Sequence, residues 1–200
     1  MLGLLAATDA RWADVALADL DAVLRDHAHC EMKAASHALS LAARHPDDLE
    51  LVRRLVAIAQ EELVHFDQVL AVLARRGIAL GTPPVDGYAA ALRARTSKLP
   101  RATRGALVPP LVDRLLVCAL IEARSCERFK LLFERLEGEL LAFYKELFAA
   151  EARHFREFVD LATAASSEAL AGARLRQIAA IEAEIVRERA SSGDRASIHG

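Results

Sequence analysis

The chain has 200 residues, of which 54% are hydrophobic and 27% charged, and 26 basic residues nearly balance 28 acidic ones. This composition excludes disordered and collagen-like proteins, and a formal charge of −2 argues against a nucleic-acid binder that is basic over its whole surface. Three cysteines without CxxC spacing argue against a disulfide framework. With no apolar run of ~18 residues and no basic leader before the first apolar residues, we expect a cytoplasmic protein that does not bind membranes.

The first half of the chain predicts one helical hairpin. Apolar residues recur at helical spacing over residues 12–44, without glycine or proline, and His45-Pro46 ends that helix. Asp47 is the expected N-cap of the next helix, with Glu50 completing a capping box. This second helix is expected to end at Gly77.

The second half predicts another hairpin after a long crossover. Residues 77–110 hold nine of the fifteen glycines and prolines, so this crossover has room only for a short helix near residues 88–95. Long helices follow over residues 111–136 and 138–164. Ser166-Ser167 can cap a fifth helix over residues 168–189, whose alternating charges predict a largely solvated face, and residues 191–200 are expected to form a loose tail.

Two helical hairpins joined by a long crossover indicate an all-α fold, the ferritin-like four-helix bundle, here with an additional C-terminal helix. We expect residues 1–165 to form the bundle, with the crossover at 77–110, and residues 166–200 to form the C-terminal helix and tail. A helical bundle without a cofactor has the same outline, so function must come from particular residues.

Two ExxH motifs occupy corresponding helices of the two hairpins. One is Glu62 with His65, and the other is Glu151 with His154. At this spacing the two side chains of each motif point to nearly the same helix face. In ferritin-like dinuclear proteins, each of the two partner helices adds one glutamate.

Counting from the turns selects those two glutamates. Glu62 lies about fifteen residues after the first turn and Glu31 about fifteen before it, while Glu151 and Glu122 each lie about fourteen residues from the second turn. At ~1.5 Å per residue, both pairs are level within their hairpins, roughly 20–23 Å from the turns. All four glutamates share a stripe with apolar residues, where a carboxylate is costly unless it binds a cation.

Four carboxylates and two imidazoles predict a dinuclear metal site. Two divalent ions balance the four negative charges, and this donor set suits iron or manganese. We assign Glu62 and Glu151 as bridges, with Glu31 and His65 completing one metal position and Glu122 and His154 the other. No catalytic residue is predicted beyond these six ligands.

Several alternatives stay open at this point. Glu61 could be the ligand in place of Glu62, although symmetry with Glu151 favours Glu62. Glu127 could be the ligand in place of Glu122, but it would not lie level with Glu151 in the hairpin. His27, one turn before Glu31, is either a group that contacts a ligand or a surface histidine. In a bundle without metal, the same glutamates would simply be exposed.

Four blocks of sequence resemble the tRNA 2-methylthio-isopentenyl-adenosine hydroxylases of the MiaE type, over roughly residues 4–162. They begin at residues 27, 61, 121 and 151 and read HAHCEMKAA, EELVHF, IEARSCERF and EARHF. The third block is the most specific, because generic diiron oxidases and ferritins do not share it.

This resemblance implies a non-haem diiron monooxygenase with two iron ions per chain. It would use dioxygen, and electrons from a donor protein, to hydroxylate the isopentenyl group of a hypermodified adenosine in tRNA. We expect a monomer or small homo-oligomer. The alternatives are a ferritin-like iron oxidase or storage protein with the same six ligands, and an RNA-binding bundle with a vestigial metal site.

One segment of the crossover bears on RNA binding. Between Asp86 and Asp113 there are no acidic residues, whereas five are basic: Arg93, Arg95, Lys98, Arg101 and Arg104. They are candidate phosphate contacts, and Tyr88 is a candidate for stacking on a base. A solvated basic loop is the competing interpretation.

Overall fold

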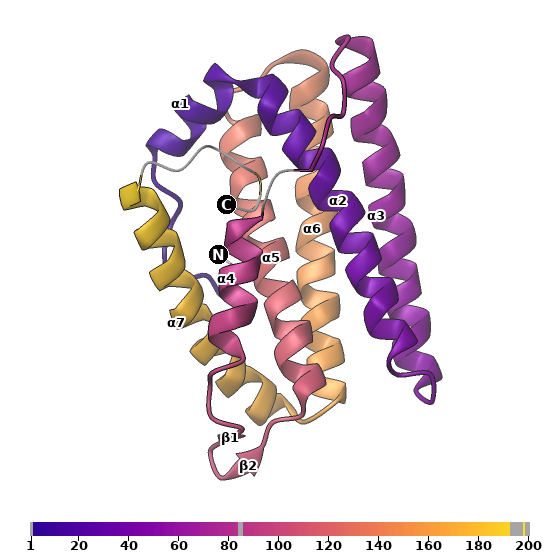
Figure 1. The fold of residues 1–200 in the computed structure, drawn as a ribbon, viewed down its shortest axis with the longest axis vertical. Coiled ribbons are helices and arrows are strands. Elements are labelled where there is room, and N and C mark those ends of the chain that lie inside the picture. Colours follow the sequence, from indigo (N-terminus) through magenta and orange to yellow (C-terminus); the bar gives the residue numbers. More distant parts are fainter. Residues whose placement is uncertain (1, 84–85, 193–197, 199–200) are drawn as a thin grey trace. The chain divides into compact units, whose positions relative to one another are not determined.

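The computed structural model describes residues 2–83, 86–192 and 198. Within these residues the chain forms seven helices and one two-stranded sheet (Figure 1). None of the helices in this part of the chain is long and apolar enough to cross a membrane. The chain divides into two compact units, one within residues 16–85 and the other within residues 1–15 and 86–200.

The unit within residues 16–85 is a helical hairpin of α2 (Leu20–Ala43) and α3 (Leu49–Arg75), which pack along each other. The prediction of one continuous helix over residues 12–44 was wrong, because α1 (Arg11–Ala18) is separate. Asp19 leaves the helical region, and its side chain accepts a hydrogen bond from the amide of Ala22. An N-cap of this kind starts a new helix even without glycine or proline.

The start of α3 differs from the prediction by one residue. Asp48, not Asp47, is the N-cap, and its side chain accepts a hydrogen bond from the amide of Leu51. The residue three positions after the true cap is therefore Leu51, which has no carboxylate, so the expected capping box does not form. The end of α3 is confirmed, since Gly77 follows with a φ of 67°, a conformation that favours glycine.

The other unit is built on the hairpin of α5 (Pro110–Phe133) and α6 (Gly138–Ala164), which pack along each other as Figure 1 shows. The crossover contains α4 (Gly87–Thr96), close to the expected 88–95. It also contains an unpredicted hairpin of β1 (Ala102–Thr103) and β2 (Ala106–Leu107). Arg104 and Gly105 form its two-residue turn with φ values of 51° and 79°.

The last helix, α7 (Glu168–Ser192), packs against α4, α5 and α6. Ser167 accepts a hydrogen bond from the amide of Leu170, as expected of a cap. The prediction of a largely solvated, charged helix was incomplete, because Arg174 and Glu182 are both fully buried. Their charges are balanced by partners on another helix, Asp113 and Arg124 of α5.

Candidate metal centre

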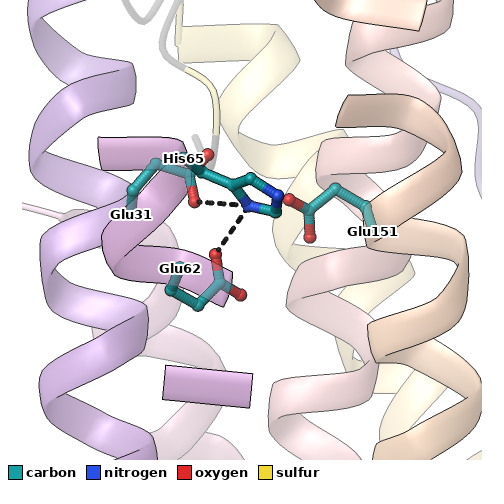
Figure 2. Close-up of side chains that lie close together, drawn as sticks. All are labelled: Glu31, Glu62, His65 and Glu151. Atoms are coloured by element: carbon teal, nitrogen blue, oxygen red, sulfur yellow. Dashed lines mark hydrogen bonds and ion pairs between the residues drawn. The ribbon is translucent and has the colours of Figure 1, made fainter. Parts of the chain in front are cut away.

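The hairpin of α2 and α3 gathers three of the six expected ligands. Glu31, Glu62 and His65 each offer a ligand atom, and these atoms lie within 4.8 Å of one another. His65 Nδ1 lies 3.4 Å from Glu62 Oε2 and 3.9 Å from Glu31 Oε2, as the dashed lines in Figure 2 indicate. All three side chains are buried. This is the arrangement that the turn counting predicted within the hairpin.

The two candidate glutamates at the start of the first ExxH motif, Glu61 and Glu62, differ in burial. Glu62 is fully buried, whereas its neighbour Glu61 is exposed. His27 is also fully buried, so the interpretation of it as a surface histidine was wrong. Its Nε2 lies 2.6 Å from Oε1 of Glu31, one helical turn along α2. A histidine four residues before a glutamate on a helix is a sequence signal for such a contact.

The hairpin of α5 and α6 carries the other three expected ligands, all buried: Glu122, Glu151 and His154. His154 Nδ1 lies 3.7 Å from Glu151 Oε2. Within the described residues, Glu122 and His154 are not among the ligand atoms that are set within 4.8 Å of one another.

The thiol of Cys126 lies close enough to the carboxylates of this hairpin for their charges to affect its pKa. It is four residues after Glu122, it is buried, and it donates a long hydrogen bond of 3.5 Å to the carbonyl of Phe148 on α6. Burial first, and then the charges of Glu151 and Glu122, raise the pKa of Cys126 to about 12. The thiol is therefore protonated at neutral pH.

Glu127, the alternative to Glu122, belongs to a different cluster. It accepts hydrogen bonds from the hydroxyl of Thr8 (2.6 Å) and from the guanidinium of Arg124. Arg124 also donates to both carboxylate oxygens of Glu182 at 2.9 and 3.0 Å, and Tyr88 donates to the same carboxylate at 2.9 Å. This buried cluster joins the N-terminal segment, α4, α5 and α7, and no local pattern in the sequence predicts it.

The crossover segment exposes most of the basic residues expected to contact RNA. Arg93, Lys98, Arg101 and Arg104 are exposed, whereas Arg95 donates to Glu188 of α7 at 3.0 Å. Tyr88 requires a correction, because its side chain is fully buried and its hydroxyl is held by Glu182. A ring without exposed area cannot stack on a base, so Tyr88 is a core residue.

The residues present fit a cation at each hairpin. Oε2 of Glu151 is buried and accepts no hydrogen bond within the described residues. A buried carboxylate oxygen without a donor is costly unless a cation compensates it. Carboxylate and imidazole donors in a two-to-one ratio suit iron or manganese.

The profile of a family described as tRNA-(MS[2]IO[6]A)-hydroxylase (MiaE) matches residues 2–197. The chain belongs to the MiaE family. The match extends past the resemblance seen over residues 4–162 and includes α7.

Two relatives carry the name tRNA 2-(methylsulfanyl)-N(6)-isopentenyladenosine(37) hydroxylase. The protein from Pseudomonas putida is 42% identical over 175 residues, which cover 88% of this chain and 82% of that protein. The protein from Salmonella typhimurium is 36% identical over 137 residues, which cover 68% of this chain and 48% of that protein. This chain therefore spans about half the length of the Salmonella relative.

A solved structure has the same fold. It is described as protein 43 with aldehyde deformylating oxygenase activity from Synechococcus. It is 36% identical, covers 98% of this chain and 95% of its own, and superimposes with a TM-score of 0.86. The predicted all-α, ferritin-like fold of two hairpins, a crossover and an additional C-terminal helix is thereby confirmed.

Proposed function

We propose that this chain is a dioxygen-dependent tRNA hydroxylase acting on the isopentenyl group of a hypermodified adenosine. One observation carries the proposal: a member of the MiaE family buries a glutamate and an ExxH pair in each of its two hairpins. The relatives from Pseudomonas putida and Salmonella typhimurium are named for hydroxylation of this nucleoside. The family and the buried donor set support the same chemistry independently.

The proposed metal centre combines the ligands of both hairpins. Glu31 and His65 would hold one iron ion, Glu122 and His154 the other, and Glu62 and Glu151 would bridge them. When bound, the two ions supply the reduction of dioxygen by two electrons from a donor protein. The overall reaction consumes one dioxygen, two electrons and two protons, inserts one oxygen atom into a C–H bond and releases one water.

The protein's own residues contribute charge balance and the exclusion of water. Four carboxylates carry four negative charges, which two divalent ions cancel, so the occupied site is formally neutral. Apolar residues line the helices around the second half of the site: Leu115, Ala119, Phe129, Leu147 and Phe158 are each at most 3% exposed. Charged groups interact more strongly in such an environment than in water.

The basic crossover residues are the proposed contacts to tRNA phosphates. Arg93, Lys98, Arg101 and Arg104 are exposed on one segment, although the whole chain is slightly acidic. Replacing Arg93, Lys98 and Arg101 by Gln should weaken tRNA binding and reduce its dependence on salt, because fewer counterions are released. Filter binding at several salt concentrations measures both. The matched control is Arg95→Gln, whose guanidinium is held by Glu188; equal effects in the two variants would contradict this assignment.

The function is tested by incubating the iron-loaded protein with tRNA that carries the isopentenylated adenosine, a reductant and dioxygen. Nucleoside mass analysis should show a gain of one oxygen atom on that adenosine. A protein that takes up many irons and leaves the nucleoside unchanged would instead support the storage alternative.

Neighbouring glutamates provide a matched pair of variants for the same assay. Glu62→Gln should abolish product and lower the bound iron, because it removes a buried bridging carboxylate. Glu61→Gln should leave both unchanged, because Glu61 is exposed on the same helix. Equal activity of the two variants would refute the proposed bridge.

A further inference from the structure

The two oxygens of the Glu31 carboxylate have different histidine neighbours, His27 at one oxygen and His65 at the other. Both residues lie on α2, and both are buried, with His27 fully so. The Nε2 atom of His27 lies 2.6 Å from Oε1 of Glu31, while Oε2 of Glu31 lies 3.9 Å from Nδ1 of His65. An ionised carboxylate only accepts hydrogen bonds, so with Glu31 ionised, Nε2 of His27 carries a proton and its N–H donates the hydrogen bond to Oε1.

The other hairpin has a different residue at the position that corresponds to His27. The glutamate and ExxH motif of α2 and α3 recur in α5 and α6, so Glu31 corresponds to Glu122. One turn before Glu122 the chain has Cys118 instead of a histidine, and Cys118 is buried. A thiol is a weak donor compared with an imidazole N–H. The two terminal glutamates therefore have different neighbours at the same helical position.

We propose that His27 is a positioning residue that fixes Glu31 through Oε1 and leaves Oε2 for a metal ion, which makes the two metal positions unequal in affinity. This inference rests on the metal centre proposed above. A hydrogen bond to a ligating carboxylate orients it before the metal arrives, and loss of such a contact typically lowers metal affinity by ~10–100-fold. The ion held by Glu31 and His65 gains this orientation from an imidazole one turn earlier on the same helix, whereas Glu122 has the thiol of Cys118 at that position.

The test is a calorimetric titration of the metal-free protein with Fe(II) under anaerobic conditions, which gives a Kd for each ion. His27→Ala should raise the Kd of one ion by about 10–100-fold and leave the other ion unchanged. His27→Gln should restore most of the affinity, because its amide also donates a hydrogen bond. Cys118→Ala is the matched control at the equivalent position of α5 and should leave both ions unchanged.

Double variants assign the weakened ion. In His154→Ala, which retains the ligands Glu31 and His65, adding His27→Ala should weaken the ion that remains. In His65→Ala, adding His27→Ala should have no further effect. Circular dichroism of each metal-free variant checks that the helices are retained. If His27→Ala does not fold, His27→Leu, which fills similar space but donates no hydrogen bond, takes its place and should raise the Kd of the same single ion.

Distinct outcomes separate this inference from the proposed function. The wild-type protein should bind two ions. If it does, and His27→Ala leaves both affinities unchanged or weakens both equally, the role of His27 is refuted while the metal centre stands. An effect of Cys118→Ala as large as that of His27→Ala refutes it as well. A wild-type protein that binds fewer than two ions refutes the metal centre itself, and this inference with it.

Discussion

The buried guanidinium of Arg124 is expected to be the costliest single side chain to remove from its unit. It donates to both oxygens of Glu182, to Glu127, to the hydroxyl of Thr8 at 3.0 Å and to the carbonyl of Ala6 at 2.9 Å. Burial alone would lower the pKa of Arg124, but the charges around it, Glu182 first, raise that pKa above its usual value. The arginine is therefore charged at all working pH values.

Arg124→Met removes the cation and leaves two carboxylates buried without it, since Glu127 and Glu182 are at most 4% exposed. Breaking a buried ion pair by removing one partner costs about 3–5 kcal/mol of unfolding free energy. At roughly 2–4 °C per kcal/mol for a chain of this size, Tm should fall by about 6–20 °C.

Urea and thermal unfolding followed by circular dichroism measure the effect of Arg124→Met. The control is Arg95→Met, which breaks an exposed pair with Glu188 and should leave Tm nearly unchanged. The double variant Arg124→Met with Glu182→Leu should be no less stable than Arg124→Met alone, because it removes one of the stranded charges. A loss below about 1 kcal/mol for Arg124→Met, the range of exposed pairs, would refute the reasoning.

Two further predictions concern other buried groups. Cys126, with its pKa raised to about 12 chiefly by burial, is protonated at pH 8, so iodoacetamide should leave it unmodified in the native metal-free protein and modify it in urea; peptide mass analysis checks this, and equal labelling in both states would contradict it. Arg174 donates to both oxygens of Asp113, at 2.6 and 2.8 Å, and to the carbonyl of Pro100 at 3.0 Å. Arg174→Met should therefore speed amide hydrogen exchange over residues 100–108, and unchanged exchange there would show that other contacts hold the β1–β2 hairpin.

The sequence alone predicted most of the helices and placed Glu31, Glu62 and His65 close together on one hairpin, as the structure has them. Helical periodicity predicted the long helices, and Gly77 and Gly138 predicted where turns interrupt them. Glu31 was chosen as the partner of Glu62 because the two residues are equally far from the turn between their helices. These inferences succeed because a helix rises by a constant amount per residue, so two residues equally far from a tight turn lie level.

Tertiary structure decided what the local pattern left open. The α5–α7 partners of Arg124 and Arg174, Glu182 and Asp113, lie about sixty residues away along the chain. No periodicity therefore predicts that Glu182 is buried in α7, or that Tyr88 of α4 is buried and unable to reach RNA. Likewise, the sequence left His27 open as a surface residue or a contact of a ligand, and the tertiary structure showed that it is buried and contacts Glu31. Spacing along one helix fixes which way a side chain points, whereas its partner, and with it the free energy of a buried charge, depends on which distant segment packs against it.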